Sequence, residues 1–354
     1  MSNLLNIGIT EELFSDVRPE PYPAIDLSEL TDNPKIKITK LPDYNGQPFD
    51  AQAVAGLDAL VTANAAVSRE SLLPEAKLTL ISRIASGYDD IDLDAMTTAG
   101  VAYSRAGGHY SKTVSLAAYT LMLSVLLRLG EKMQLCRAGD EAWFKGSRMA
   151  GFDPRPRTLG LVGLGAIGQE ILRLAAPLGM TRLVHTRTRK EGLDNSMDFR
   201  YASLEDLLKQ ADVVVLACAL TDETRNLLSE ERLALLKKGA CVVNVGRGEL
   251  IDERALISAL DSGELGGAGL DVTVHEPVSE GSALFDHPKV IVTPHSLGVT
   301  DYSHQLAGAE ALAAIQDLMS GKPIRNLANN SVLKEPAFLK KCSDIKEVVS
   351  GLKI

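Results

Sequence analysis

The sequence is poor in cysteine, and the few cysteines form no pattern. Only four occur in 354 residues, and none belongs to a C-x-x-C pair. This spacing excludes a disulfide framework and a cysteine-based metal site. We therefore expect Cys136, Cys218, Cys241 and Cys342 to be reduced, mostly buried thiols. We also expect the protein to bind no metal and to be cytoplasmic.

An excess of positive charge is also lacking. The chain has 37 Lys and Arg against 46 Asp and Glu, for a net charge of −9. General polyanion binders carry the opposite balance. We expect no nucleic-acid partner.

Long hydrophobic runs are missing as well. The longest apolar stretch, residues 114–127, contains serine, threonine and tyrosine and falls short of the roughly 20 residues that cross a bilayer. Residues 1–6 lack the basic segment and long apolar core of a secretory signal. We expect an intracellular protein without a membrane partner.

The most informative pattern that is present is G-x-G-x-x-G, directly after the apolar run 159–162. In a βαβ unit the first glycine permits a tight turn, the second lets the backbone approach a pyrophosphate, and the third lets the helix pack on the strand. Apolar residues follow at helical spacing, and a helix N-terminus binds phosphate. The predicted cofactor-binding residues of this turn are Gly163, Gly165, Ala166, Ile167 and Gly168.

Strand-like runs alternate with helical patterns along the chain, which predicts two α/β domains with parallel sheets covered on both faces. We expect a helical region over residues 114–137, a helix over 307–319, and a polar, partly ordered tail after residue 330. The expected strands are residues 6–9, 35–40, 58–61, 78–82 and 101–104, then 159–162, 182–186, 212–218, 240–245, 267–272 and 290–293.

Three polar residues follow successive strands of the second series: Arg247, Glu276 and His295. Ligands of doubly wound sheets bind beyond the carboxyl ends of the strands. An arginine fork holds a carboxylate, a histidine exchanges a proton near neutrality, and a carboxylate orients that histidine. Singly, these residues are equally explained as a surface arginine, a turn and a helix cap. Together they predict hydride transfer between a nicotinamide and a 2-keto acid.

Five stretches carry a family resemblance: LVGLGAIG (161–168), ADVVVLACALTDETRNLL (211–228), LKKGACVVNVGRGELID (236–252), GGAGLDVTVHEP (266–277) and VIVTPH (290–295). On these motifs the chain resembles the D-isomer-specific 2-hydroxyacid dehydrogenases over about residues 5–328. The resemblance implies an NAD(P)-dependent oxidoreductase.

The resemblance also implies roles for single residues. Arg247 would bind substrate, His295 would be the acid/base, and Glu276 would support it. Asp271 would meet the nicotinamide carboxamide, and the segment SRIASGYDDID (82–92) would hold the substrate carboxylate through backbone N–H groups. That carboxylate site is Ser86 and Gly87, and the remaining cofactor positions are Ala219, Val245, Gly246 and again His295.

The architecture that the resemblance implies is a Rossmann nucleotide domain inserted in a flavodoxin-like substrate domain. Residues 1–107 and 299–330 would form the substrate domain, residues 108–298 the dinucleotide-binding domain, and residues 331–354 the tail. Active sites of the family lie between the domains. Members are usually homodimers, with the region around residues 114–137 commonly at the interface.

One departure from the family concerns the cofactor. NAD-binding members have an acidic residue at the end of the second strand for the ribose hydroxyls. Here Thr186 stands at that position, followed by Arg187, Thr188, Arg189 and Lys190. Loss of the anion and gain of guanidinium groups favour the 2′-phosphate of NADP(H). NAD(H) stays open, because the same residues also describe an ordinary basic surface loop.

Other departures affect the substrate and the helix contacts. Thr62 stands where phosphoglycerate-type members have an arginine, and little sequence follows residue 330, so we expect an unphosphorylated substrate and no regulatory domain. Residues 117–119 lack the family's glutamate, and Ala219 replaces its usual proline.

The leading hypothesis is an NADP(H)-dependent reductase of glyoxylate, hydroxypyruvate or a larger 2-keto acid. Two alternatives share the fold: a dehydrogenase of another small anion, such as phosphite, and a nucleotide-sensing scaffold like the transcriptional corepressors. The acidic charge and the absence of a nuclear localisation run weigh against the scaffold.

Overall fold

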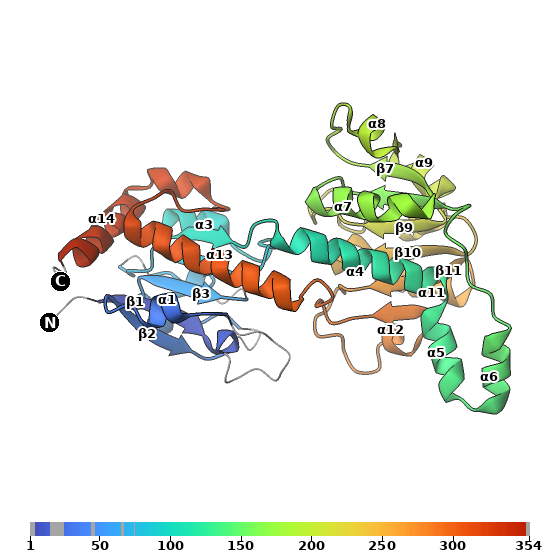
Figure 1. Cartoon of the computed structure of the whole chain (residues 1–354), viewed down its shortest axis with the longest axis horizontal. Coiled ribbons are helices and arrows are strands. Elements are labelled where there is room, and N and C mark those ends of the chain that lie inside the picture. Colours follow the sequence, from blue (N-terminus) through green and yellow to red (C-terminus); the bar gives the residue numbers. More distant parts are fainter. Residues whose placement is uncertain (1–3, 15–24, 44–46, 65–66, 74, 352–354) are drawn as a thin grey trace. The chain divides into compact units, whose positions relative to one another are not determined.

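The structure, a computed structural model, describes residues 4–14, 25–43, 47–64, 67–73 and 75–351. The chain divides into two compact units, one formed by Met1–Tyr110 with Thr300–Ile354 and the other by Ser111–Val299 (Figure 1). Residues 1–3, where the signal-sequence expectation begins, lie outside the described residues.

The first unit is built on a parallel sheet of five strands in the order β2-β1-β3-β4-β5. This is the doubly wound order of flavodoxin-like folds, and all five strands were predicted. The strands are β1 (Leu5–Thr10), β2 (Ile36–Leu41), β3 (Ala59–Thr62), β4 (Leu80–Arg83) and β5 (Ala102–Arg105).

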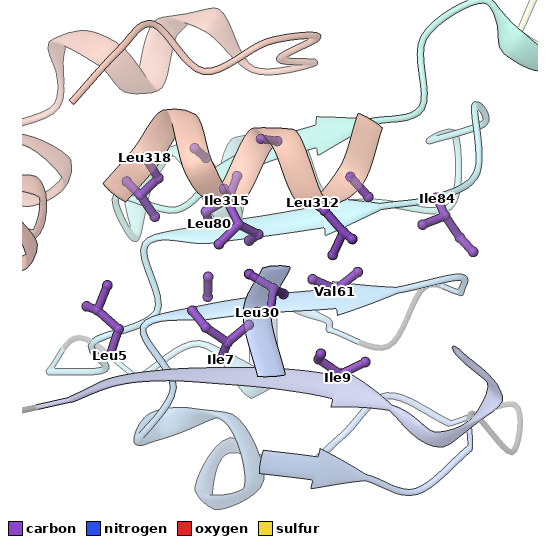
Figure 2. Close-up of a cluster of buried hydrophobic side chains, with 14 of the residues drawn as sticks. Leu5, Ile7, Ile9, Leu30, Val61, Leu80, Ile84, Leu312, Ile315 and Leu318 are labelled. Atoms are coloured by element: carbon purple, nitrogen blue, oxygen red, sulfur yellow. The ribbon is translucent and has the colours of Figure 1, made fainter. Parts of the chain in front are cut away.

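Helix α13 (Asp301–Ser320) covers one face of this sheet with an apolar face that includes Leu312, Ile315 and Leu318 (Figure 2). The predicted helix at 307–319 is confirmed but begins earlier, because Thr300 and Ser303 form a capping box. The short helices of this unit are η1 (Glu11–Leu13), α1 (Ser28–Thr31), α2 (Ala51–Ala55), η2 (Arg69–Ser71), α3 (Leu93–Thr98) and η5 (Asn330–Lys334).

The carboxy-terminal segment differs from the expected partly ordered tail, because it forms helix α14 (Pro336–Gly351). Phe338 and Ile345 are buried in the core of the first unit. The ammonium group of Lys341 donates hydrogen bonds to the carbonyl oxygens of Leu78 (2.9 Å) and Ala99 (2.8 Å). Lys341 therefore faces the unit, whereas the exposed polar residues Lys340, Asp344, Lys346 and Glu347 form the outer side of an amphipathic helix.

The second unit is built on seven parallel strands in the order β12-β11-β10-β9-β6-β7-β8. Read from β8, this is the Rossmann order with one added strand. Six strands were predicted; the missed one, β8, has only two residues. The strands are β6 (Thr158–Val162), β7 (Thr181–His185), β8 (Arg200–Tyr201), β9 (Val213–Leu216), β10 (Ala240–Asn244), β11 (Leu265–Leu270) and β12 (Val290–Val292).

The expected helical region at 114–137 is two helices, α4 (His109–Leu126) and α5 (Leu129–Arg137), with Arg128 in the left-handed conformation between them (φ 57°). Among the described residues no single helix is long and apolar enough to span a membrane, and only the pair α4–α5, bent by 60°, meets the length and composition criteria together. The other helices of this unit are α6 (Asp140–Ser147), α7 (Ala166–Ala175), η3 (Ala176–Leu178), α8 (Leu193–Met197), α9 (Leu204–Gln210), α10 (Glu230–Leu233), η4 (Gly248–Leu250), α11 (Glu253–Asp261) and α12 (Ala283–Asp286).

Candidate active site

Glycine occupies the three motif positions of the turn between β6 and α7 for three different physical reasons. Gly163 has a φ of +102°, and a Cβ there would lie 2.6 Å from the carbonyl oxygen of Ala217. A Cβ on Gly168 would lie 2.1 Å from the carbonyl oxygen of Gly163. Gly165, by contrast, would place its Cβ in open space. The first and third glycines are thus required by the fold, whereas the second leaves an open approach to the backbone.

That open approach fits a dinucleotide. Gly165 is the N-cap of α7, and Ala166 beside it is exposed. The first N–H groups of a helix have no acceptor within the helix, and the dipole there is positive. The turn also lies where the strand order reverses, between β6 and β9. Pyrophosphates bind at this point of doubly wound sheets.

The loops after β9 and β10 meet beside this turn. A Cβ on Gly246 would lie 2.9 Å from the carbonyl oxygen of Cys218, and Val245 is buried at the end of β10. Ala219 is exposed, and its carbonyl oxygen accepts a hydrogen bond from the hydroxyl of Thr224 (2.8 Å). The family's proline position is therefore fixed here by a side-chain hydrogen bond to the backbone.

Arg247, Glu276 and His295 come together at the carboxyl edge of the sheet, because β10, β11 and β12 are parallel neighbours. Glu276 Oε2 lies 2.8 Å from His295 Nδ1. The Arg247 guanidinium donates to the carbonyl oxygen of Gly246 (2.7 Å) and lies near enough to act electrostatically on Glu276. The grouping predicted from the sequence is present.

The Glu276 carboxyl has competing influences on its pKa. Burial raises it, but the hydrogen bond and positive charge of His295, the N–H of Thr273 and the charge of Arg247 lower it further. The net shift is downward from the ordinary value of 4.5. Glu276 is therefore an anion at neutral pH and stabilises positive charge on the His295 ring.

The backbone of His295 is in the left-handed region, with a φ of +51°, which few non-glycine residues adopt. Asp271 holds this turn from the end of β11. Its buried Oδ1 accepts hydrogen bonds from the hydroxyl of Thr293 (2.7 Å) and from the N–H groups of Ser296 and Leu297 (both 3.2 Å). Asp271 thus bonds to residues on both sides of His295.

Asn244 does the same for Arg247, and the sequence reasoning missed it. Its side chain is 1% exposed, donates to the carbonyl oxygen of Arg247 (2.7 Å) and accepts from the N–H of Gly246 (3.0 Å). A Cβ on Gly248 would lie 2.0 Å from the carbonyl carbon of Thr273, so only glycine fits there. A polar residue ending an apolar strand is the signal that could have identified Asn244.

The basic loop at residues 186–190 begins where β7 ends, and Arg187, Thr188, Arg189 and Lys190 are exposed. Within the described part of the chain, none of its three cationic side chains forms an ion pair. Arg187 is near enough to Glu223 to contribute to the lowered pKa of that carboxyl, after the larger effect of the Thr221 hydroxyl. Arg189 lies against the ring of Tyr201.

Ser86 and Gly87 belong to the other unit, in the loop between β4 and α3. The carbonyl oxygens of three successive residues there each accept a hydrogen bond from another part of the same unit. Those of Ala85, Ser86 and Gly87 accept, in that order, from Ala106 N–H (3.2 Å), Arg105 Nη1 (3.1 Å) and Arg83 Nη1 (3.0 Å). Because a trans peptide points its N–H opposite to its C=O, the N–H of Ser86 points away from the donor on Ala85 O, and the N–H of Gly87 points away from the donor on Ser86 O.

Arg83 was not singled out from the sequence, although it organises this loop. Its side chain is nearly buried and forms two hydrogen bonds with the carboxylate of Asp90, at 2.7 and 3.1 Å. It also donates to the carbonyl oxygen of Ala63 in the neighbouring loop (3.2 Å). A buried fork with these partners joins the loops after β3 and β4.

Comparison with known proteins agrees with this fold. The sequence profile of the D-isomer specific 2-hydroxyacid dehydrogenase NAD-binding domain matches residues 119–296. The chain is 35% identical over 298 residues to a glyoxylate reductase of Thermococcus kodakarensis, covering 80% of this chain and 87% of that one. It is 33% identical over 296 residues to glyoxylate/hydroxypyruvate reductase B of Salmonella paratyphi A, covering 82% and 91%.

A solved structure, the glyoxylate reductase from Paecilomyes thermophila, superposes with a TM-score of 0.77 at 28% identity, covering 93% of this chain and 99% of that one. With the Rossmann sheet and its glycine turn, these likenesses define the class of the protein: an oxidoreductase with a nicotinamide cofactor. More particularly, the chain belongs to the D-isomer specific 2-hydroxyacid dehydrogenase family.

Proposed function

We propose that this protein is an NADP(H)-dependent reductase of small, unphosphorylated 2-keto acids. The observation that carries the proposal is the pair formed by His295 and Glu276, whose Nδ1 and Oε2 atoms are 2.8 Å apart at the carboxyl edge of the Rossmann sheet. A histidine held by a carboxylate gives and takes a proton near neutral pH. The other ring nitrogen is then available to a substrate oxygen.

The residues would act as follows. His295 donates the proton that converts the carbonyl oxygen of the keto acid into a hydroxyl. Glu276 holds the imidazole through Nδ1 and stabilises its cationic form. Arg247 binds the substrate through its guanidinium fork and polarises the carbonyl. A bound dihydronicotinamide would supply the hydride to C2, so that one hydride and one proton would make a 2-hydroxy acid.

The cofactor would be held by the second unit, Ser111–Val299. The turn from Gly163 to Gly168 takes the pyrophosphate, and Ala219, Val245 and Gly246 line the nicotinamide side. Asp271 serves the nicotinamide carboxamide while its Oδ1 supports the turn at His295.

The first unit would supply the substrate loop. The N–H groups of Ser86 and Gly87 bind the substrate carboxylate, a proposal supported by the hydrogen bonds that hold the carbonyl oxygens of the same two peptides, those of Ala85 and Ser86. Two adjacent N–H donors suit an anion. Thr62 at the position of the phosphoglycerate-type arginine supports an unphosphorylated substrate.

Preference for NADP(H) is supported by the basic loop. Thr186 carries no charge to repel a 2′-phosphate, and Arg187 and Arg189 follow directly. Glyoxylate and hydroxypyruvate are the first candidate substrates, because the relatives at 33–35% identity are named for them.

The test is a steady-state assay of the purified protein with NADPH and with NADH. The keto acids are glyoxylate, hydroxypyruvate, pyruvate, phenylpyruvate and 3-phosphohydroxypyruvate, and chiral chromatography identifies the product. We expect turnover with the small unphosphorylated acids, a D-configured product where C2 is chiral, and a higher kcat/KM for NADPH. Nucleotide binding with negligible turnover of every acid would instead support a scaffold, and NADP⁺ reduction by phosphite alone would support the other alternative.

We also propose a homodimer. Helices α5 and α6 expose several large apolar side chains, with Trp143 55% and Phe144 62% exposed. Exposed apolar surface of this kind marks an interaction site. Light scattering after gel filtration should give twice the mass of the chain, and Trp143→Lys with Phe144→Lys should halve it. A wild-type protein of monomer mass would contradict the dimer.

A further inference from the structure

Tyr201 links strand β8 to the basic loop. Its hydroxyl accepts a hydrogen bond from the N–H of Lys190 and donates one to the carbonyl oxygen of the same residue, both at 3.0 Å. A phenol can donate and accept at once. Both backbone polar groups of Lys190 are thus held by one side chain eleven residues further along the chain.

The ring of Tyr201 holds the neighbouring residue. The guanidinium carbon of Arg189 lies 5.2 Å from the ring centroid, which is within the range of a cation–π contact. Phe199, which is buried, packs edge-on against the same ring, with centroids 5.0 Å apart and planes at 83°. The core of the unit therefore braces the ring on which Arg189 lies.

This arrangement lowers the cost of binding an anion. A free arginine side chain loses rotamer entropy when it is ordered on a ligand. A guanidinium that is stacked on an aromatic ring is already ordered, and its N–H donors point outward in the plane of the group. Within the described structure Arg187 is not stacked on an aromatic ring, and its positive charge helps to lower the pKa of the Glu223 carboxyl.

We propose that Tyr201 is the positioning residue for cofactor selectivity: it holds Arg189 and Lys190 in the conformation that receives the 2′-phosphate of the adenosine ribose. The inference rests on the proposed NADP(H) preference and deepens it. Tyr201 acts through Arg189 and the backbone of Lys190, without touching the cofactor.

The direct test is calorimetric binding of two small probes, adenosine 2′,5′-diphosphate and 5′-AMP, which differ only in the 2′-phosphate. In Tyr201→Leu the Kd of the diphosphate should rise about five-fold, while the Kd of 5′-AMP stays within about two-fold. Tyr201→Phe keeps the ring, so its affinity for the diphosphate should fall only about two-fold. Phe152→Leu is the matched control, because the guanidinium carbon of Arg157 lies 4.6 Å from the centroid of the Phe152 ring in the same unit. This substitution should change neither Kd.

A double-mutant cycle identifies the partner. The effects of Tyr201→Leu and Arg189→Ala on the Kd of the diphosphate should be strongly non-additive, because each substitution removes the same stacked pair. The effects of Tyr201→Leu and Arg187→Ala should be additive. In kinetics, Tyr201→Leu should raise KM for NADPH and leave kcat at saturating NADPH and KM for NADH unchanged.

The outcomes separate the two levels of the proposal. A wild-type protein with equal affinity for both probes overturns the NADP(H) preference. A wild-type protein that prefers the diphosphate, with the same preference in Tyr201→Leu, overturns only the role of Tyr201. An equal loss of affinity for both probes in Tyr201→Leu would show that Tyr201 has only a structural role. A Tyr201→Phe protein with the affinities of the wild type would show that the hydroxyl does not contribute to the positioning.

Discussion

Nδ1 of His295 and Oε2 of Glu276 are 2.8 Å apart, although the two residues are separated by 19 positions and lie in loops after neighbouring strands. The same histidine has a φ of +51°. Its ring is thus oriented by a carboxylate and its backbone by a strained turn that Asp271 supports. Strain of this kind costs about 1–3 kcal/mol and persists only where the surroundings enforce it.

Replacement of His295 should abolish most of the chemistry. We expect His295→Asn to lower kcat by roughly two to four orders of magnitude, the scale for losing a general acid. Asparagine tolerates a positive φ, so the turn should persist. His275→Ala, in the neighbouring exposed loop, is the control with near-normal kcat. Calorimetry should give an unchanged Kd for NADP⁺, and near-normal turnover in His295→Asn would exclude the acid role.

Replacement of Glu276 should change the pH dependence. The lowered pKa of Glu276 keeps it ionised at every pH above its ordinary 4.5, so its help to the His295 cation is lost only in acid. Glu276→Gln removes that anion at all pH values. kcat/KM for keto-acid reduction should therefore be about ten-fold lower than in the wild type at neutral pH, and the difference should shrink in acid as the wild-type carboxylate is protonated.

Hydroxy-acid oxidation needs the neutral ring, so Glu276→Gln should affect it less than it affects keto-acid reduction. Glu280→Gln, which changes the same charge four residues away, is the matched control. A profile unchanged in both directions would show that Glu276 does not act on the ring.

Arg247→Lys keeps the charge and loses the planar fork. We expect kcat/KM for the keto acid to fall about 100-fold or more, chiefly through KM, because a bidentate contact becomes a point charge. Arg225→Lys, on the neighbouring loop and partly paired with Glu249 (3.7 Å), should leave the kinetics unchanged. Wild-type kinetics in Arg247→Lys would mean that no bidentate contact is made.

Cofactor choice should depend on the basic loop. Charge-assisted hydrogen bonds are worth roughly 1.5–3 kcal/mol each, and solvent exposure reduces that value. Arg187→Ala with Arg189→Ala should therefore lower kcat/KM for NADPH at least about ten-fold and leave NADH nearly unaffected. Thr186→Asp should begin to favour NADH. A wild-type preference for NADH would make this loop ordinary solvated surface.

Helix α14 should stabilise the first unit. Phe338 is 4% exposed and its neighbour Leu339 is 54% exposed, so the two form an internal control. Phe338→Ala should destabilise that unit by about 3–5 kcal/mol, because it removes a buried ring and leaves a cavity. Leu339→Ala should cost less than about 1 kcal/mol. The free energy of unfolding of the first unit in urea, monitored by hydrogen exchange, would be compared between the two variants. Equal losses of stability would contradict the packing of α14.

Much of the fold could be predicted because its signals are local. Apolar runs of strand length and the glycine turn each need only a few adjacent residues. Strand β8 has two residues and no apolar run, so it gave no such signal. Helix α14 was missed because its polar face dominates the composition, whereas Phe338 and Ile345 become core residues only when the sheet is present.

The sequence by itself determined the α/β class, the parallel sheets and the residues Arg247, Glu276 and His295, because residues that follow parallel strands must emerge at one edge. Only the tertiary structure decided the hydrogen bond that His295 donates to Glu276, the support that Asn244 and Asp271 give the two loops, and the Arg83 fork that holds the Ser86 loop. The stack of Arg189 on Tyr201 belongs to the same group. These contacts join residues from different loops, and their geometry depends on strand order and register, which no local pattern encodes.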